Sequence, residues 1–238
     1  MRADYRYFIS KTGIELPLIG FYDSPDVDPF MPIIKPVKGA RACLFAFYKH
    51  WLEGKSLILS EDNFGCGGAG SWLFDIRTRT RQQYIEFLVD DEGLKHNYTL
   101  MDKWLDIVKA YKPENPFIVI GPLKEEMQEQ LKTVSFIINP DQLSMLVIAA
   151  QYYSSPDDED PVISPFGSGC MQLVSKFKDL GVAQAIIGGT DMAMRQYLPP
   201  DKLIFTVTKS MFEKICSIGK DSFLEKSFME RLKKARNK

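Results

Sequence analysis

Short apolar runs alternate with longer amphipathic stretches along the chain. Runs rich in β-branched and aromatic residues between turn residues predict buried strands. They lie at residues 16–25, 56–60, 116–123, 134–140, 183–189 and 202–209. Stretches with apolar positions at helical spacing predict helices. These lie at residues 40–55, 77–91, 98–111, 124–132, 141–153, 171–181, 190–198, 210–220 and 227–238.

Turn and capping residues set the expected ends of these elements. Gly54 is expected to end the first helix, and Thr99 and Asp141 are expected to begin two others as N-caps. Prolines make residues 26–39 a predicted loop. The acidic stretch at residues 154–161 is expected to be an exposed loop.

The alternation of strands and helices predicts an α/β or α+β fold, with a mixed sheet flanked by helices. The chain has 238 residues, of which 45% are hydrophobic and 26% are charged. This is an ordinary globular composition, and the length is enough for a sizeable core. No stretch divides the sequence cleanly, so we expect one domain over residues 1–238.

Charge and leader composition exclude several classes of partner. Lys and Arg number 30 against 31 Asp and Glu, a net charge of -1, so neither nucleic acid nor an anionic membrane is an expected partner. The first residues are polar, and no apolar run reaches the length of a membrane helix. We therefore expect a cytoplasmic protein with its four cysteines reduced.

Two glycine-rich stretches, FGCGGAG at 64–70 and FGSGC at 166–170, are the candidate binding loops. Successive backbone N–H groups in such loops can form a concave anion site. The glycines and serine in question are Gly65, Gly67, Gly68, Gly167, Ser168 and Gly169. Neither stretch matches a nucleotide-binding motif, so no cofactor is assigned.

Each glycine loop contains a cysteine that is a candidate reactive group. Cys170 directly precedes the helix predicted from residue 171, where the helix dipole favours a thiolate. Cys66 is the corresponding candidate in the first loop. A buried, inert thiol is the alternative for both, and it is the favoured interpretation for Cys43 and Cys216.

A polar group follows the strand predicted at 183–189. Thr190 is the expected N-cap of the next helix, in which Asp191 and Arg195 lie one turn apart. Such a pair is most often a surface salt bridge. If it faces a cleft, Arg195 would hold a carboxylate or phosphate.

The two loops also suggest an internal duplication. A shift that places Phe64 on Phe166 places Cys43 on Met145, and each half contains a Pro-Asp dipeptide after its first strand. The halves would span about 16–110 and 116–216. A twofold relation between them would bring both glycine loops toward one place.

Four stretches resemble the family of uncharacterised proteins grouped as domain of unknown function 169, also labelled ArCR. They are EGKSLILSEDNFGCGGAG, NPDQLSMLVIAAQYY, PFGSGC and IIGGTDMAMRQYLPPDKLIFTVTKSMFE. The likeness covers roughly Pro17 to Cys216, and Cys66 and Cys170 occupy motif positions. The resemblance implies no activity for them.

Three functions fit these observations. The first is an enzyme or binding protein for a small anionic ligand, with its pocket between the two glycine loops. The second is a redox protein that holds a metal or an iron–sulfur cluster through cysteine thiolates, for which two cysteines alone are too few. The third is a non-catalytic scaffold that forms homo-oligomers.

Overall fold

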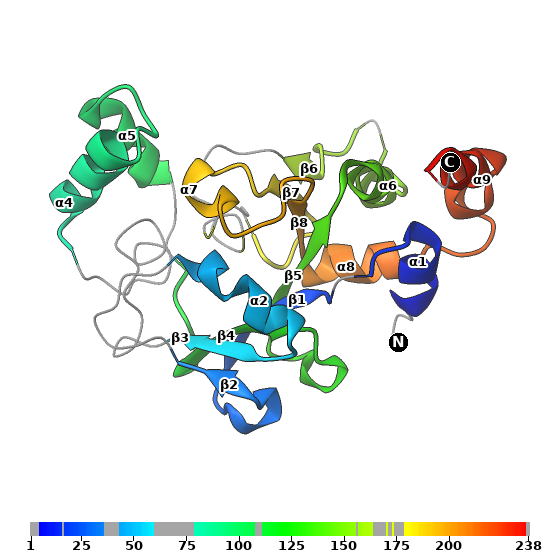
Figure 1. The fold of residues 1–238 in the computed structure, drawn as a ribbon, viewed down its shortest axis with the longest axis horizontal. Helices are drawn as coiled ribbons and strands as arrows, with labels where there is room; N and C mark the ends of the chain where they lie inside the picture. Colours follow the sequence, from blue (N-terminus) through cyan, green and yellow to red (C-terminus); the bar gives the residue numbers. More distant parts are fainter. Residues whose placement is uncertain are drawn as a thin grey trace.

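A computed structural model gives the architecture of the chain (Figure 1). It describes residues 5–15, 17–35, 43–59, 79–107, 111–155, 157–163, 170, 173 and 179–236. Strands and helices alternate along these residues, and the fold is α/β with a mixed sheet, as the sequence predicts.

The described strands form one eight-stranded sheet in the order β2-β3-β4-β1-β5-β8-β7-β6. Their bounds are β1 Ile19–Ser24, β2 Ile33–Ile34, β3 Ser56–Leu59, β4 Phe117–Pro122, β5 Leu131–Ile138, β6 Val162–Ile163, β7 Ala185–Gly188 and β8 Leu203–Thr208. The two edge strands, β2 and β6, were not predicted. Each has only two residues, which is too short for a hydrophobic period to show.

The sheet consists of two halves with the same topology. Read outward from the centre, β1-β4-β3-β2 in one half matches β5-β8-β7-β6 in the other. Within each half the inner pairings are antiparallel and the outermost pairing is parallel. The central strands β1 and β5 pair antiparallel, with Gly20 opposite Val134. A rotation about an axis through this pair therefore relates the strands of the two halves.

The edge of each half repeats in detail. Ile33 pairs with Ser56 in the first half, and Val162 pairs with Ala185 in the second. The amide of Ser56 donates to the carbonyl of Pro32 at 2.9 Å, and the amide of Ala185 donates to the carbonyl of Pro161 at 2.7 Å. The β2–β3 and β6–β7 pairs thus have the same backbone hydrogen-bonding register as well as the same place in the strand order.

The register that pairs Phe64 with Phe166 differs from that of the strands. Cys43 lies between β2 and β3, whereas Met145 lies on the helix between β5 and β6. The second glycine stretch follows β6, so its counterpart is the segment after β2; the first glycine stretch follows β3. The shift is wrong because it aligned two glycine-rich stretches of sequence instead of the strands that precede them.

The described α-helices are α1 Tyr5–Thr12, α2 Tyr48–Leu52, α4 Arg81–Glu86, α5 Tyr98–Ile107, α6 Pro140–Gln151, α7 Met192–Arg195, α8 Lys209–Cys216 and α9 Ser227–Arg236. All of them except α1 overlap a predicted helix, and α1 was not predicted. Shorter helical turns are η1 Asp28–Phe30, η2 Leu44–Phe47, η3 Phe87–Asp91, η4 Glu125–Met127 and η6 Phe223–Glu225.

Two predicted helices are wrong in extent. Residues 124–132 contain only η4 before β5 begins at Leu131, because a charged stretch next to a buried strand has no apolar face to pack. Residues 40–55 hold only η2 and α2 within the described part. Residues 171, 172 and 174–178 of the helix predicted at 171–181 lie outside the described residues.

One predicted helix cap is displaced by two residues. Asn139, not Asp141, caps α6, since its side chain accepts from the amide of Gln142 while Gln142 bonds back to the amide of Asn139. Asp141 lies in the first turn and pairs with Arg236 instead. The reciprocal hydrogen bonds of the Asn139–Gln142 capping box stabilise this helix start, and Asp141 has no comparable partner for capping.

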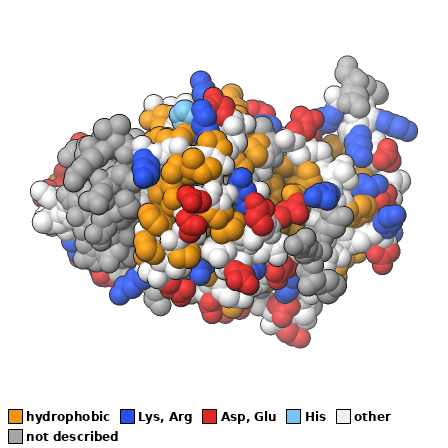
Figure 2. Space-filling model, turned by 90° about the horizontal axis from the view of Figure 1, so that it is seen from below, with side chains coloured by type: hydrophobic (Ala, Val, Ile, Leu, Met, Phe, Trp, Pro, Cys, Tyr) orange, Lys and Arg blue, Asp and Glu red, His pale blue; other side chains and the backbone are white. Residues whose placement is uncertain are grey.

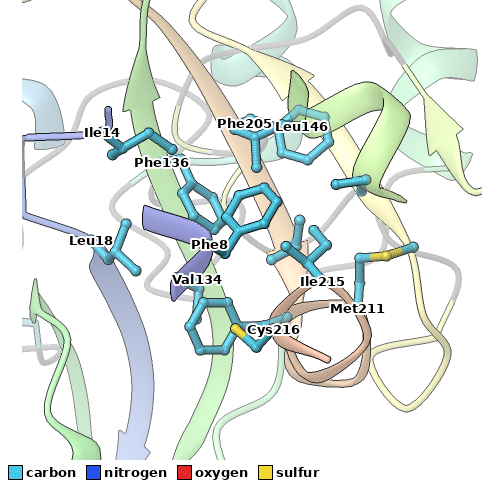
Figure 3. Close-up of a cluster of buried hydrophobic side chains, with 14 of the residues drawn as sticks. Phe8, Ile14, Leu18, Val134, Phe136, Leu146, Phe205, Met211, Ile215 and Cys216 are labelled. Carbon is cyan, nitrogen blue, oxygen red and sulfur yellow. The ribbon is translucent and has the colours of Figure 1, made fainter. Parts of the chain in front are cut away.

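Apolar residues cover both faces of the sheet. Alternate positions of one strand point to opposite faces, so Leu57 and Leu59 pack into one cluster and Ile58 into the other. The first cluster includes α2, α4 and α5 side chains. The second lies under α1, α6 and α8, where Phe8 of α1 and Phe136 and Phe205 of the sheet meet (Figure 3).

Hydrophobic side chains also gather on the surface over β2, the lowest strand in Figure 1 (Figure 2). Met31, two residues before β2, is an exposed large residue. Its neighbours Ile33 and Ile34 are half-buried. Because β2 is only two residues long, this edge offers little backbone for pairing with another chain.

Candidate functional site

A pocket of about 400 Å³ lies between α4 and α5. We call it the α4–α5 pocket. Its lining residues are Arg81, Gln82, Ile85, Tyr98, Thr99 and Asp102. Both helices belong to the connection from β3 to β4, at one end of the molecule (Figure 1).

This connection is where the two halves of the sheet differ most. Residues 60–116 join β3 to β4, whereas residues 189–202 join β7 to β8. The pocket therefore lies in a segment for which the second half has no counterpart. Ligand sites are often built on such connections over a rigid scaffold.

Local sequence fixes where the two helices begin. Thr80 and Gln83 form a reciprocal capping box at the start of α4, with hydrogen bonds of 3.0 and 3.3 Å. The side chain of Asn97 accepts from the amide of Leu100 at 2.9 Å at the start of α5. The expectation that Thr99 caps α5 is therefore wrong, because Asn97 takes that role.

Arg81 joins the two helices electrostatically. Its Nε donates to Oδ1 of Asp102 at 2.7 Å, and its Nη2 donates to Oδ1 of Asp106 at 2.6 Å and to the carbonyl of Asp102 at 2.8 Å. The hydrogen bond to Asp102 is the main cause of a raised pKa for Arg81. The guanidinium thus stays charged and holds two carboxylates at the pocket.

Tyr98 supplies an aromatic wall of the pocket, and its side chain is 46% exposed. Its hydroxyl donates to the carboxylate of Asp90, whose oxygens lie 2.8 and 3.0 Å away. This hydrogen bond raises the pKa of Tyr98, so the phenol remains neutral. The ring is held in place while one face stays open to solvent.

Acidic side chains outnumber basic ones on the elements that form the pocket. On α4, η3 and α5 they are Glu86, Asp90, Asp91, Asp102 and Asp106, against Arg81 and Lys103. Nearby, Arg79 lies over the ring of Phe87, 4.6 Å from its centroid. Carboxylates therefore outnumber cations on the described elements that form the α4–α5 pocket, which favours a cation over an anion.

Most residues of the predicted glycine-loop site lie outside the described part of the chain. These are Gly65, Cys66, Gly67, Gly68, Gly167, Ser168 and Gly169. The strands that precede the loops are described. β3 and β6 run in opposite directions, so the chain leaves them at opposite ends of the sheet. Strand direction alone does not bring the two loops together.

Cys170 is described, and it is 6% exposed. It packs in the first apolar cluster with Leu173, Met194 and Leu198. Cys43 is half-buried against the same cluster, and Cys216 is buried in the second one. The apolar surroundings of the three described cysteines favour the interpretation of small core residues.

The polar group after β7 forms part of the backbone scaffold. Asp191, not Thr190, caps α7, because its carboxylate accepts from the amide of Ala193 at 2.9 Å. Thr190 is exposed and precedes the cap. Asp191 is one residue nearer than Thr190 to the first free amides of α7.

Arg195 donates to backbone carbonyls of the connection between β7 and β8. Its Nη1 donates to the carbonyls of Gly189 and Lys202, and its Nη2 donates to those of Pro199 and Pro200. An anion could bind Arg195 bidentately only by displacing some of these hydrogen bonds. The geometry therefore favours a role in holding this connection together.

Replacing this guanidinium is expected to destabilise the protein. Arg195→Ala leaves up to four carbonyls without their donor, and we expect a loss of about 2 kcal/mol in the free energy of unfolding. Arg195→Lys keeps the charge but not the fork, so it should recover only part of the loss. Urea unfolding checks both variants, and an unchanged Arg195→Ala protein would contradict the scaffold role.

The described residues contain neither a metal-binding cluster nor a membrane-spanning helix. No group of three or more His, Cys, Asp or Glu in the described part could hold a metal ion. Among the same residues, no helix has both the length and the apolar content needed to cross a membrane.

The residues of the α4–α5 pocket were not predicted as functional from the sequence. Arg81 and Asp102 are charged residues on two predicted helices, and such residues usually lie on a solvated surface. Their pairing across two helices depends on the packing of α4 against α5. The local sequence feature that could have pointed to this pocket is the run of Arg, Thr and Gln residues before Tyr84.

Comparison with known proteins identifies the family but no characterised relative. No curated protein and no solved structure matches the chain. The model of the family described as domain of unknown function 169, uncharacterised ArCR, matches residues 18–217. This range covers the whole sheet and the α4–α5 pocket. The chain is therefore a member of the domain of unknown function 169 family, as its glycine-cysteine stretches indicate.

Proposed function

We propose that this protein binds a small, positively charged organic ligand in the α4–α5 pocket. The observation that carries the proposal is the presence of an exposed tyrosine ring and a carboxylate in the same pocket, those of Tyr98 and Asp102. Aromatic faces and carboxylates are the groups that recognise amines and guanidines.

The carboxylates keep capacity for such a ligand. Arg81 donates hydrogen bonds to one carboxylate oxygen of Asp102 and to one of Asp106. A carboxylate can accept about four hydrogen bonds in all. The Asp102 and Asp106 side chains are 50% and 64% exposed. A ligand amine could therefore reach them without breaking the bridge that holds α4 to α5.

The sign of the ligand's charge is the main change from the sequence-based expectation. An anionic ligand was expected because of the glycine loops, and that site remains a separate prediction for Cys66 and residues 167–169. We still propose that the protein binds a small ligand, but the acidic surroundings of the α4–α5 pocket favour a cation there.

Thermal-shift screening with amines and anions tests the proposal. Agmatine, 1,4-diaminobutane and choline are expected to raise the melting temperature, whereas phosphate and citrate are not. Calorimetry on the best amine should show that Asp102→Asn lowers affinity about tenfold or more. Asp201→Asn, at an aspartate that is 63% exposed and far from the pocket in sequence, is the matched control and should bind as wild type.

The tyrosine gives a second, independent readout. Tyr98→Phe keeps the ring and should bind nearly as well as wild type, while Tyr98→Ala should weaken binding about two- to fivefold. Binding of phosphate or citrate but no amine would contradict the proposal. So would an affinity that Asp102→Asn leaves unchanged in a protein with native circular dichroism.

A further inference from the structure

The carboxylates around the α4–α5 pocket fall into two groups. The first group is Asp102 and Asp106 on α5, which share the guanidinium of Arg81. The second group is Glu86 at the end of α4 and Asp90 on η3. The two groups differ in their counter-charge, so they offer a ligand two separate places for a positive charge.

Two side chains that line the pocket connect it to the second group. The hydroxyl of Tyr98 donates to the carboxylate of Asp90, and Nε2 of Gln82 donates to Oε1 of Glu86 at 3.0 Å. The hydrogen bond to Asp90 is the main cause of the raised pKa of Tyr98, and the charges of Asp90 and Glu86 add to it. Both carboxylates therefore lie near the phenol at the pocket wall.

The second group has no cation of its own within the described part of the chain. There the partners of Asp90 and Glu86 are Tyr98 and Gln82, both neutral, and neither carboxylate forms an ion pair. Both side chains are exposed. Since a carboxylate can accept about four hydrogen bonds, each keeps most of its capacity. This group is thus the less neutralised of the two.

The backbone of η3 fixes the place of Asp90. This element is a π-helical turn, in which the amide of Glu92 donates to the carbonyl of Phe87 at 3.1 Å, five residues back. Such turns are rare and occur frequently at functional sites. Here the turn continues α4 and brings Asp90 to the hydroxyl of Tyr98. The carboxylate is therefore positioned by the backbone as well as by its hydrogen bond.

The ring of Tyr98 separates the two groups. Tyr98 and Asp102 are four residues apart on α5, so they share a helix face and differ by about 6 Å along the axis. A tyrosine side chain on a helix points back toward the N-terminus, which carries the hydroxyl and Asp90 further from Asp102. An ammonium bonds its acceptor at about 3 Å, so one seated at Asp102 leaves Asp90 without a cation.

We infer that the ligand of the α4–α5 pocket is a linear amine with two or more ammonium groups. One ammonium pairs with Asp102, another pairs with Asp90 and Glu86, and the carbon chain between them lies along the ring of Tyr98. This inference rests on the proposed binding of a cation and adds the chemical class of the ligand. A monocation such as choline pairs with only one of the two groups.

Calorimetry with two amines of equal chain length tests the inference. Wild-type protein should bind 1,4-diaminobutane at least about fivefold more tightly than butylamine, which has the same carbon chain and one ammonium. Asp90→Asn keeps an acceptor for Tyr98 but loses the charge. It should lower this affinity ratio to about two, the advantage that two equivalent ends give. Asp91→Asn removes an exposed charge one residue away and is the matched control, which should keep the wild-type ratio.

The outcomes separate this inference from the proposed function. Equal affinities of wild-type protein for the two amines would overturn the inference and leave cation binding intact, and this comparison needs no variant. Equal falls in the ratio for Asp90→Asn and Asp91→Asn would also overturn it, because they would show a general effect of net charge. Binding of no amine at all would overturn the proposed function and the inference with it.

Discussion

Replacing Asp23 by alanine is expected to destabilise the protein by about 3–5 kcal/mol. Asp23 lies on the central strand β1 and is 1% exposed. Its carboxylate accepts from the hydroxyl of Tyr111 at 2.6 Å and from the amides of Glu114 and Asn115 at 2.8 and 2.9 Å. Removing it leaves three donors without their acceptor in a buried place.

This carboxylate holds the chain where it returns from α5 to β4. Burial, followed by the hydrogen bond to Asp23, raises the pKa of Tyr111, so the phenol remains a donor at neutral pH. Tyr111 also packs edge-on against Phe21, with 5.3 Å between ring centroids. The link therefore joins the pocket-bearing connection to the rigid sheet.

Graded variants separate the contributions of this network. Tyr111→Phe removes one donor and should cost about 1–2 kcal/mol, and Asp23→Asn should fall between it and Asp23→Ala. Guanidinium unfolding measures all three. A loss below about 1 kcal/mol for Asp23→Ala would show that water replaces the carboxylate and that the link is weak.

Gly121→Ala is expected to cost about 3 kcal/mol, near the upper end for overpacking in a core. Gly121 lies on β4 beside Ser56 of β3. A methyl group at this position would lie 2.7 Å from Cβ and 2.8 Å from Cα of Ser56, and the latter is backbone that cannot turn away. The strands would have to separate locally.

A double variant and a matched glycine test this explanation. Ser56→Gly in the Gly121→Ala background removes the side-chain part of the clash and should restore part of the stability. Gly219→Ala is the control, because its new methyl group would meet only Oδ1 of Asp221 at 3.4 Å. Its effect should stay within about 0.5 kcal/mol. Equal losses for Gly121→Ala and Gly219→Ala would refute the close-packing argument.

Strands buried on both faces were predictable because their sequences are continuous apolar runs. IVI in β4 and FII in β5 lie where they were expected. Helix caps were less predictable, since Asn139 prevails over Asp141 only through its reciprocal bond with Gln142. The site was least predictable, because Arg81 meets Asp102 across two helices whose packing leaves no local pattern in the sequence.

The shared strand order leads us to propose that the sheet arose by duplication of a four-stranded unit, with β1–β4 and β5–β8 as its copies. The predicted boundary near residue 110 then moves past β4, which belongs to the first copy by its pairing with β1 and β3. The α4–α5 segment is the part that departs from the repeat. An experimental structure in which β2–β4 did not superpose on β6–β8 would contradict the duplication.

An NMR titration of the backbone amides with the best-binding amine tests the central claim most directly, because it reports both binding and its location. We predict concentration-dependent shifts confined to α4, η3, α5 and the residues that cap the two helices, Thr80 and Asn97. Saturable shifts that map instead to α6 and α9 or to the β7–α7 turn, with α4 and α5 unchanged, would contradict the assignment of ligand binding to the α4–α5 pocket.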